Sequence, residues 1–539
     1  MLAFSAFFVL LLGSVSETHS LSLHERDGII PCESISAPEV SGAEVISISA
    51  EEKLNASSIS LVGTSIETIY GLDICQVNVS LTHPEVGDKV TIEVWLPLKH
   101  WNHRFQAAGG GGWMAGYPAT WTLGDPVRKG YVAASTDGGA LAPDGVLGPK
   151  TFSSPGVIDV GLFTDFASRA LHEMAVVSKA VAGEYYGSPV KYSYWNGCST
   201  GGRQGYMMAQ KYPDDFDGIM ANAPALYWPT FMLSLNWAHF LMNSEKTYPD
   251  PCVYAAFQKA SIKACDGLDG VIDGIIADPR SCLFEPHSLI GLEVECNGKQ
   301  MIVSSKDADI IARIRQGPRS PTGLQLWDGY DYGIDYQGIA PTITRDGATG
   351  NVPETMADNW VQYFLKKDPN FDFSTIVTLE QLTELFAIAH SEWGGIIGTD
   401  NPDLSAFRDK GGKLLSWHGT ADNRIMINNT IRYRTQVEGI MGGSSLVNDF
   451  YRLFFPPGVS HCGGGYGPTP YNAFDALVAW VEQGKKPETI LGAFMDEQGH
   501  NVTREICPWP LVSRYNGVGD PKRAKSYSCA NSYGPPATL

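Results

Sequence analysis

The segment Gly197–Gly201 constrains this chain more than any other, because it reads Gly-Cys-Ser-Thr-Gly at a predicted strand-to-helix junction. Residues 190–195 (VKYSYW) have the pattern of a strand, and residues 201–213 (GGRQGYMMAQKYP) that of a helix. A serine on so tight a turn has a strained backbone and needs small neighbours, while the helix directs its amides toward a developing anion. The pattern predicts that Ser199 is a nucleophile; the alternative is an ordinary glycine-rich turn in a chain with 58 glycines.

Strand-like and helix-like segments alternate around this turn. Residues 163–187 carry apolar side chains at helical spacing and end in Gly187, and residues 216–224 form a strand-like segment. The same patterns recur at 90–97, 104–110, 411–419 and 451–458 (strands) and at 473–484 (a helix). Strand and helix in alternation predict an α/β fold with a parallel sheet flanked by helices.

Two long segments do not show this alternation of strands and helices. Residues 21–90 show β-branched alternation and predict short antiparallel strands. Residues 227–406 are rich in Trp, Tyr, Asp, Gly and Pro without clear alternation, and a chain of 539 residues is too long for one ordinary domain. We therefore expect a catalytic domain formed by residues 21–226 and 407–539, interrupted by a lid domain at 227–406.

A serine nucleophile needs a base and an acid that orients the base, in the chain order Ser, Asp or Glu, His on this kind of fold. His461 follows the predicted strand at 451–458, where the carboxyl edge of a sheet presents loop residues. His418 is its competitor, at the end of the strand at 411–419, and Asp422 lies four residues further on. The other downstream histidines are His239, His287, His390 and His500. The favoured triad is Ser199, Asp422 and His461, on an α/β-hydrolase fold with a large inserted lid domain.

Two cysteines flank the proposed pair. Cys198 precedes Ser199 and Cys462 follows His461. If serine and histidine meet, their neighbours lie within the ~7 Å between Cα atoms that a disulfide requires. The expected bridge is Cys198–Cys462; the alternative is that each pairs elsewhere.

At this point the chain resembles the tannase and fungal feruloyl esterase family. The resemblance rests on GCSTGGRQGYMMAQKYPDDFDGIMANAPA, NPDLSAFRDKGGKLLSWHGTAD and GVSHCGGG, and extends over nearly the whole chain after residue 20. It implies that Ser199 forms an acyl-enzyme, that His461 is the general base and then the acid, and that Asp422 orients His461.

The oxyanion hole of this fold takes one amide from the residue after the nucleophile, here Thr200. The second is expected from the glycine run 109–112, because only glycine lets backbone amides approach a ligand so closely. Within the run we favour Gly110, and the alternative is that the run is only a flexible loop.

Residues 265–282 (CDGLDGVIDGIIADPRSC) alternate aspartates with glycines, which suits a hard cation. They do not form an EF-hand, since Arg280 stands where that loop needs Glu. The family resemblance implies a structural Ca²⁺ in the lid, held by the side chains of Asp266, Asp269 and Asp273 and the carbonyls of Val271 and Ile275. A solvated acidic turn is the alternative.

Ten cysteines, an even number, fit an oxidising compartment. Cys265 and Cys282 flank the aspartate loop and are expected to bridge it. The resemblance implies Cys32–Cys75 and Cys507–Cys529. Cys252–Cys296 is left by elimination and departs from the family pattern.

The first residues predict secretion. Residues 2–15 are an apolar run too short to span a bilayer, so residues 1–20 are predicted to be a signal peptide cleaved after Ser16 or Ser20; a membrane anchor is the alternative. Glycosylation sequons stand at Asn55, Asn78, Asn428 and Asn501. The net charge of −19 argues against a nucleic-acid partner, and no later segment is apolar enough to be a membrane span.

The expected substrate is a small aromatic ester or a feruloylated polysaccharide. The family divides between hydroxycinnamate and gallate esters, and we favour a feruloyl esterase over a tannase because the chain lacks an evident internal dibasic processing site of the kind fungal tannases carry. Aromatic residues of the expected lid are candidates for the acyl pocket: Trp228, Trp327, Tyr330, Tyr332, Phe386 and Trp393. Two further interpretations are a peptidase on the same fold and a non-catalytic binding protein on a hydrolase scaffold.

Overall fold

The computed structural model describes residues 27–62, 65–345, 348–496 and 498–532. The predicted signal peptide, residues 1–20, lies outside the described residues.

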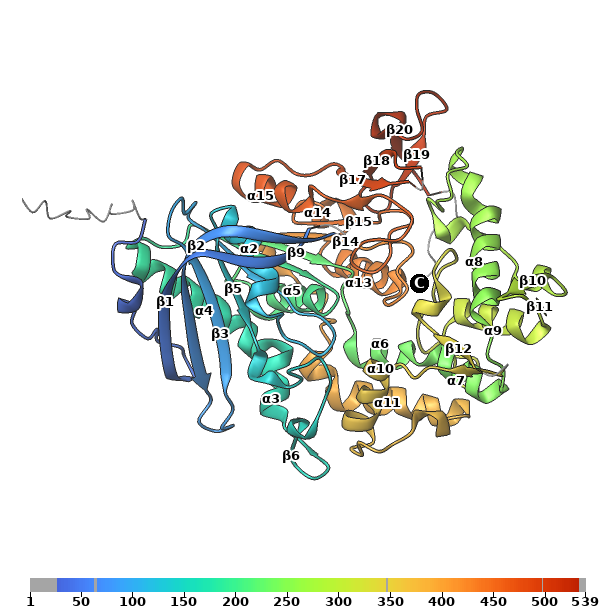
Figure 1. The fold of residues 1–539 in the computed structure, drawn as a ribbon, viewed down its shortest axis with the longest axis horizontal. Helices are drawn as coiled ribbons and strands as arrows, with labels where there is room; N and C mark the ends of the chain where they lie inside the picture. Colours follow the sequence, from blue (N-terminus) through green and yellow to red (C-terminus); the bar gives the residue numbers. More distant parts are fainter. Residues whose placement is uncertain (1–26, 63–64, 346–347, 497, 533–539) are drawn as a thin grey trace, which may run out of the picture.

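A mixed sheet forms the centre of the fold (Figure 1). In the part of the chain that the structure describes it has nine strands, in the order β1-β2-β3-β5-β4-β8-β9-β14-β15. Their bounds are Glu44–Val62 (β1), Ser65–Thr82 (β2), Val90–Pro97 (β3), Val132–Thr136 (β5), Arg104–Ala108 (β4), Tyr192–Cys198 (β8), Gly218–Asn222 (β9), Lys413–Trp417 (β14) and Tyr451–Phe454 (β15). From β5 to β15 neighbouring strands are parallel, so their carboxyl ends share one edge, the usual place for a ligand in such sheets.

The amino-terminal strands are longer than expected. Instead of short strands, β1 and β2 form one long antiparallel hairpin, and β2 continues the sheet by pairing with β3. Between residues 44 and 62 there is no glycine or proline to end a strand. Irregularities are accommodated instead as register shifts, such as those between Lys53 and Ser58.

Helices pack on both faces of the sheet, and their ends follow local sequence signals. The helix expected at 163–187 begins earlier, at Val160, because the Asp159 side chain accepts a hydrogen bond from the Leu162 amide and caps it. It runs through α3 (Val160–Thr164), a π-helical segment (Asp165–Arg169) and α4 (Ala170–Tyr186). It ends at Gly187, whose φ of 65° suits a left-handed cap. The other principal helices here are α5 (Thr200–Lys211), α13 (Ile427–Ile440) and α15 (Ala473–Gln483).

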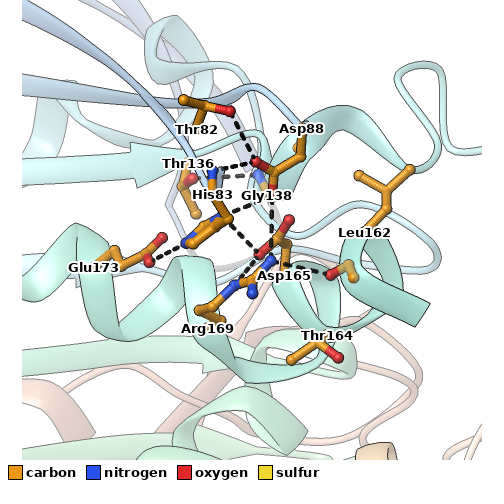
Figure 2. Close-up of polar contacts among 12 residues, drawn as sticks. Thr82, His83, Asp88, Thr136, Gly138, Leu162, Thr164, Asp165, Arg169 and Glu173 are labelled. Carbon is orange, nitrogen blue, oxygen red and sulfur yellow. Dashed lines mark hydrogen bonds and ion pairs between the residues drawn. The ribbon is translucent and has the colours of Figure 1, made fainter. Parts of the chain in front are cut away.

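A buried charge cluster joins the turn after β2 to this helix (Figure 2). His83 lies between two carboxylates, with Nδ1 2.6 Å from Asp88 Oδ2 and Nε2 2.6 Å from Glu173 Oε1. Arg169 donates from Nε to Asp165 Oδ1 at 2.6 Å and from Nη2 to Asp88 Oδ2 at 3.1 Å. Burial, and to a smaller extent the neighbouring Asp88, raise the pKa of Asp165 to about 8 against the opposing effect of Arg169.

The segment expected to be a lid is mostly helical and lies beside the sheet (green to yellow in Figure 1). Its elements are α6 (Trp228–Leu235), α7 (Trp237–Glu245), α8 (Pro251–Cys265), α9 (Ser305–Gln316), α10 (Thr355–Asn359), a π-helical segment (Trp360–Leu365), α11 (Leu379–Ile397) and the hairpins β10–β11 (Glu293–Cys296, Lys299–Ile302) and β12–β13 (Thr342–Arg345, Ala348–Asn351). This segment shares one core with the sheet side: Trp113 stacks on Phe364 with centroids 5.6 Å apart, and Phe163 contacts Trp393 at 5.5 Å. Its function as a lid stays a prediction.

The carboxyl-terminal strands pack against the aspartate loop that follows α8. They are β17 (Ile490–Met495), β18 (Asn501–Ile506), β19 (Val512–Tyr515) and β20 (Tyr527–Ala530). Arg504 of β18 is fully buried and donates from Nη2 to Asp273 Oδ2 at 2.6 Å. Its guanidinium also lies 3.9 Å from the centroid of the Tyr527 ring.

All of the expected disulfides are present. They are Cys32–Cys75, Cys198–Cys462, Cys252–Cys296, Cys265–Cys282 and Cys507–Cys529. The pairing assigned by elimination, Cys252–Cys296, is therefore confirmed.

Candidate active site

Ser199 stands at the turn between β8 and α5, at the carboxyl edge of the sheet. Its backbone has φ 64° and ψ −121°, a region that costs of order 1–3 kcal/mol for a residue with a side chain. The flanking glycines are required by contact: a Cβ on Gly197 would lie 2.5 Å from the Gly201 carbonyl oxygen, and one on Gly201 would lie 2.9 Å from the Gly110 oxygen. The structure thus places Ser199 in the elbow that the sequence predicted.

Asp422 lies in the loop after β14 and contacts both competing histidines. Its Oδ2 is 2.8 Å from His461 Nδ1 and 3.0 Å from His418 Nε2. Its Oδ1 accepts the amides of Arg424 and Ile425 at 2.7 and 2.9 Å. Burial alone would raise the pKa of Asp422, but the charge of His461 and the hydrogen bonds of the two histidines outweigh it, so the pKa lies well below the ordinary value.

The two histidines differ in access. The His418 side chain is 0% exposed, and its ring is held by Thr430 Oγ1 on one nitrogen and by Asp422 and the Ile425 carbonyl on the other. Since both ring nitrogens are already engaged, His418 has none left for a serine. The His461 side chain is 21% exposed and engages Asp422 through Nδ1, which leaves Nε2 for another partner.

Ser199 and His461 line the same cavity, which has a volume of ≈ 480 Å³. The Cys198–Cys462 disulfide, with a Cα–Cα distance of 5.9 Å, joins the residue before the serine to the residue after the histidine. The two bridged cysteines are 264 residues apart in the chain. The disulfide therefore holds the candidate nucleophile and the candidate base, which come from distant segments, close to each other at the cavity.

Of the aromatic residues suggested for the acyl pocket, only Trp228 lines this cavity within the described part of the chain. Trp327, Tyr330, Tyr332, Phe386 and Trp393 are buried in the core instead. Sequence reasoning missed the other side chains that line the cavity: Tyr117, Ala225, Phe231, Glu354, Met356, Arg424 and Ile425. The local sequence around most of these residues does not indicate that they lie near Ser199. The two exceptions are Arg424, which lies two residues after Asp422, and Tyr117, which follows soon after the glycine run.

Glu354 and Arg424 form an ion pair at the cavity wall, with Arg424 Nη1 2.9 Å from Glu354 Oε2. Glu354 precedes α10, in the segment that interrupts the sheet, while Arg424 belongs to the loop after β14. The cavity is therefore lined by both parts of the fold.

The structure corrects the expectation for Gly110. The Gly110 amide donates to Gln204 Oε1 at 3.0 Å, so it is not free to bind an oxyanion. Gly110 is needed for packing, since a Cβ there would lie 2.1 Å from the Met114 carbonyl oxygen. Gly111 also lines the cavity, and its amide makes no hydrogen bond among the described residues, so it is the candidate for the second oxyanion donor. Thr200, the first residue of α5, also lines the cavity.

Two buried polar residues of α5, which sequence reasoning missed, hold the elbow. Gln204 bridges the Gly110 amide and, from Nε2, the Ala115 carbonyl at 2.8 Å. Arg203 is 0% exposed and donates to the Ala167 carbonyl at 2.9 Å; burial lowers its pKa to about 9. The only sequence feature that could have indicated these two residues is the glycine-rich start of the helix, which carries two long polar side chains side by side.

The aspartate loop folds around Asp266, which accepts the amides of Asp273 at 3.0 Å and Gly274 at 2.9 Å. Asp269 Oδ2 is buried and has no hydrogen-bond partner among the described residues; Arg504 Nη1 lies 3.7 Å away. Three carboxylates and one guanidinium leave a formal charge of −2 in this loop. An orphaned carboxylate oxygen and uncompensated negative charge fit a hard divalent cation.

The predicted sequons differ in exposure: Asn55 and Asn501 are exposed, whereas Asn78 and Asn428 are half-buried. No helix in the described ranges has the length and apolar character needed to cross a membrane.

Comparison with known proteins places the chain in a family. The family model for tannase and feruloyl esterase matches residues 75–530. A probable feruloyl esterase of Arthroderma benhamiae is 43% identical over 525 residues, covering 96% of both chains.

Two solved structures are also similar. The tannin acyl hydrolase of Aspergillus niger has a TM-score of 0.83 at 25% identity and 92% coverage of both chains. Feruloyl esterase B of Aspergillus oryzae has a TM-score of 0.77 at 27% identity, covering 93% of this chain and 99% of its own. The chain therefore belongs to the tannase and feruloyl esterase family, whose members are carboxylic ester hydrolases.

Proposed function

We propose that the chain is a secreted serine esterase that releases hydroxycinnamic acids of the ferulate type from plant cell-wall esters. The observation that carries the mechanism is the contact between Asp422 Oδ2 and His461 Nδ1, in a cavity that Ser199 also lines. A carboxylate on Nδ1 holds the imidazole so that Nε2 can accept a proton.

In this mechanism Ser199 Oγ attacks the ester carbonyl carbon while its proton passes to His461 Nε2. The carbonyl electron pair moves to oxygen, beside the amides of Thr200 and Gly111. Collapse of this tetrahedral intermediate breaks the bond between the carbonyl carbon and the alcohol oxygen. The alcohol takes the proton from His461 and departs, which leaves an acyl-enzyme on Ser199. Water repeats the sequence, with His461 as base and then acid, and releases the carboxylic acid.

The choice of acyl group is supported by the cavity and by the relatives. Trp228, Phe231 and Met356 give the cavity large apolar walls that suit a methoxylated aromatic ring. The relative with 43% identity is named a probable feruloyl esterase. Cleavage of gallate esters is the second candidate, favoured by the TM-score of 0.83 with a tannin acyl hydrolase.

Two assays test these statements. Ser199→Ala should lower kcat on methyl ferulate by about 10⁴- to 10⁶-fold without lowering Tm, and retention of a tenth of the activity would refute the nucleophile. Turnover of methyl ferulate against methyl gallate tests the acyl group. We expect ferulate to be cleaved far faster, because the three adjacent hydroxyls of gallate would be left without hydrogen-bond partners against the apolar walls formed by Trp228, Phe231 and Met356. A site built around three hydroxyls would instead reject ferulate, which lacks them, by roughly 10⁴-fold. A preference for gallate would make the protein a tannase and leave the mechanism standing.

We also propose that the aspartate loop holds a structural Ca²⁺. Asp266, Asp269 and Asp273 would supply carboxylates, and Val271 and Ile275 backbone carbonyls. When bound, the ion would compensate the negative charge of the aspartate loop, which follows α8 and packs against β18. It would take no part in the ester chemistry. The orphaned Asp269 Oδ2 supports this assignment.

Secretion is supported by the apolar run at residues 2–15 and by the disulfides, which persist in oxidising compartments. Mass spectrometry of protein from the culture medium of the producing cell tests it: the mature chain should begin after Ser16 or Ser20 and carry glycans at the exposed Asn55 and Asn501. A chain retained inside the cell with residues 1–20 attached would contradict the proposal.

A further inference from the structure

We propose that Tyr117 is a catalytic residue whose hydroxyl donates a hydrogen bond to the oxyanion, beside the amides of Thr200 and Gly111. The inference rests on the proposed function, because it concerns the tetrahedral intermediate formed on Ser199. It adds a side-chain donor to a hole that the sequence assigned to backbone amides alone.

The direction of the Gly111 amide locates the hole. The Gly110 carbonyl accepts the Gly201 amide at 3.0 Å and so faces the start of α5. In a trans peptide the carbonyl of one residue and the amide of the next point in opposite directions. The Gly111 amide therefore points away from Gly201, and Gly111 lines the cavity together with Ser199 and Thr200.

The Tyr117 hydroxyl lies directly against Gly111. A Cβ added to Gly111 would be 1.9 Å from that hydroxyl, so the phenol occupies the space that any side chain at this position would need. Tyr117 lines the same cavity as Ser199 and His461. Its hydroxyl has no hydrogen-bond partner among the residues that the structure describes, which leaves its proton for a ligand.

The backbone around Tyr117 is fixed. Ser135 Oγ donates to the Tyr117 carbonyl at 2.8 Å, and Gly116 approaches β5 so closely that a Cβ there would lie 2.4 Å from the Thr136 carbonyl oxygen. Burial raises the pKa of Tyr117 above its ordinary value, so the phenol keeps its proton at neutral and mildly alkaline pH. A positioned donor that needs no reorganisation is what stabilises a developing oxyanion.

The test is Tyr117→Phe, which removes one oxygen atom and keeps the ring. Removal of one oxyanion donor typically lowers kcat by about 10²- to 10³-fold. We expect a fall in this range on methyl ferulate, with KM within about threefold of wild type, because the hydroxyl acts on the tetrahedral state rather than on bound substrate. The control is Tyr70→Phe, on an exposed part of β2.

A second measurement separates this function from a structural one. trans-Styrylboronic acid forms a tetrahedral adduct with an active-site serine and places an oxygen in the oxyanion hole. Tyr117→Phe should weaken its inhibition by the same factor as kcat/KM falls, while Tm stays unchanged.

Unchanged kcat, a change in KM alone, or unchanged boronate affinity would each overturn the assignment of Tyr117. An active Ser199→Ala variant would instead overturn the proposed function itself, so the two failures are distinguishable.

Discussion

His418 Nε2 lies 3.0 Å from Asp422 Oδ2, the same carboxylate oxygen that faces His461. His418 is fully buried and its ring also contacts Thr430, so its structural task is to hold Asp422 in place. The sequence favoured His461 as the base, and the structure shows that its competitor His418 lies beside the same carboxylate oxygen.

The two histidines should therefore respond differently to substitution. His461→Ala should lower kcat as much as Ser199→Ala, by about 10⁴-fold or more, and the double variant should be no worse, because triad members act as a unit. His418→Ala should instead lower Tm, since it leaves the buried Thr430 hydroxyl and one Asp422 contact unpaired, at about 1–3 kcal/mol for each unsatisfied group. Its kcat should fall far less than that of His461→Ala. An inactive His418→Ala beside an active His461→Ala would reverse the assignment.

Gln204→Leu should impair the oxyanion hole without touching the triad. Leucine cannot accept the Gly110 amide or donate to the Ala115 carbonyl, so the segment 110–115 loses both hydrogen bonds that the Gln204 side chain makes to it. We expect kcat on methyl ferulate to fall at least tenfold with a smaller change in KM. The matched control is Gln210→Leu, which lies on the same helix and bonds Tyr433. Equal kcat in the two variants would show that Gln204 does not position the run.

Removal of the Cys198–Cys462 bridge should reduce activity more than stability. The variant Cys198→Ala/Cys462→Ala frees the base loop from the nucleophile elbow, while the sheet and helices on either side keep their own packing. Activity should decay at a lower temperature than the loss of near-ultraviolet circular dichroism. The control is Cys507→Ala/Cys529→Ala, at the carboxyl-terminal strands. If both double variants lose activity and fold together, the bridge has no separate role at the site.

Chelation should destabilise the protein if the aspartate loop holds Ca²⁺. A ligand that binds only the folded state stabilises it by about 2.7 kcal/mol at 100 times its Kd, so EDTA should lower Tm by a few degrees and added Ca²⁺ should restore it. Asp269→Asn should show a lowered Tm that no longer responds to EDTA. Asp309→Asn, at an exposed position, should respond as wild type does. A wild-type Tm that ignores EDTA would contradict the assignment.

Asp165 should make stability depend on pH. Its folded pKa of about 8 exceeds the ordinary value of 3.8, so between these values the folded chain holds a proton that the unfolded chain has lost. The contribution of this proton to the free energy of unfolding is complete below about pH 4 and is lost as pH rises through 8. Asp165→Asn keeps an oxygen for the Arg169 Nε–H and removes the titration. Its Tm should fall less than that of wild type between pH 5 and 8, measured by thermal denaturation in matched buffers. Parallel curves would show that Asp165 is ionised throughout.

Features encoded by neighbours in the chain could be predicted from the sequence. Glycines on both sides of Ser199 specify the elbow, because a Cβ on either would meet backbone within 3 Å. Gly187 ends a helix for the same local reason, through a positive φ. The parallel strands were predictable from apolar runs, and the disulfide between Cys198 and Cys462 from their adjacency to two residues that must meet.

Only the tertiary structure decided which residues share the cavity. The chain order Ser, Asp, His favoured His461 over its competitor His418, and the structure shows that the His418 ring is fully buried whereas His461 is partly exposed. Gly110 and Gly111 are equivalent in sequence, yet Gln204, 94 residues from Gly110, occupies the amide of Gly110. Tyr117, Glu354 and Arg424 line one cavity although they come from three distant segments of the chain. Periodicity and turn chemistry act over a few residues, whereas the distance between segments hundreds of residues apart depends on how every helix and strand between them packs.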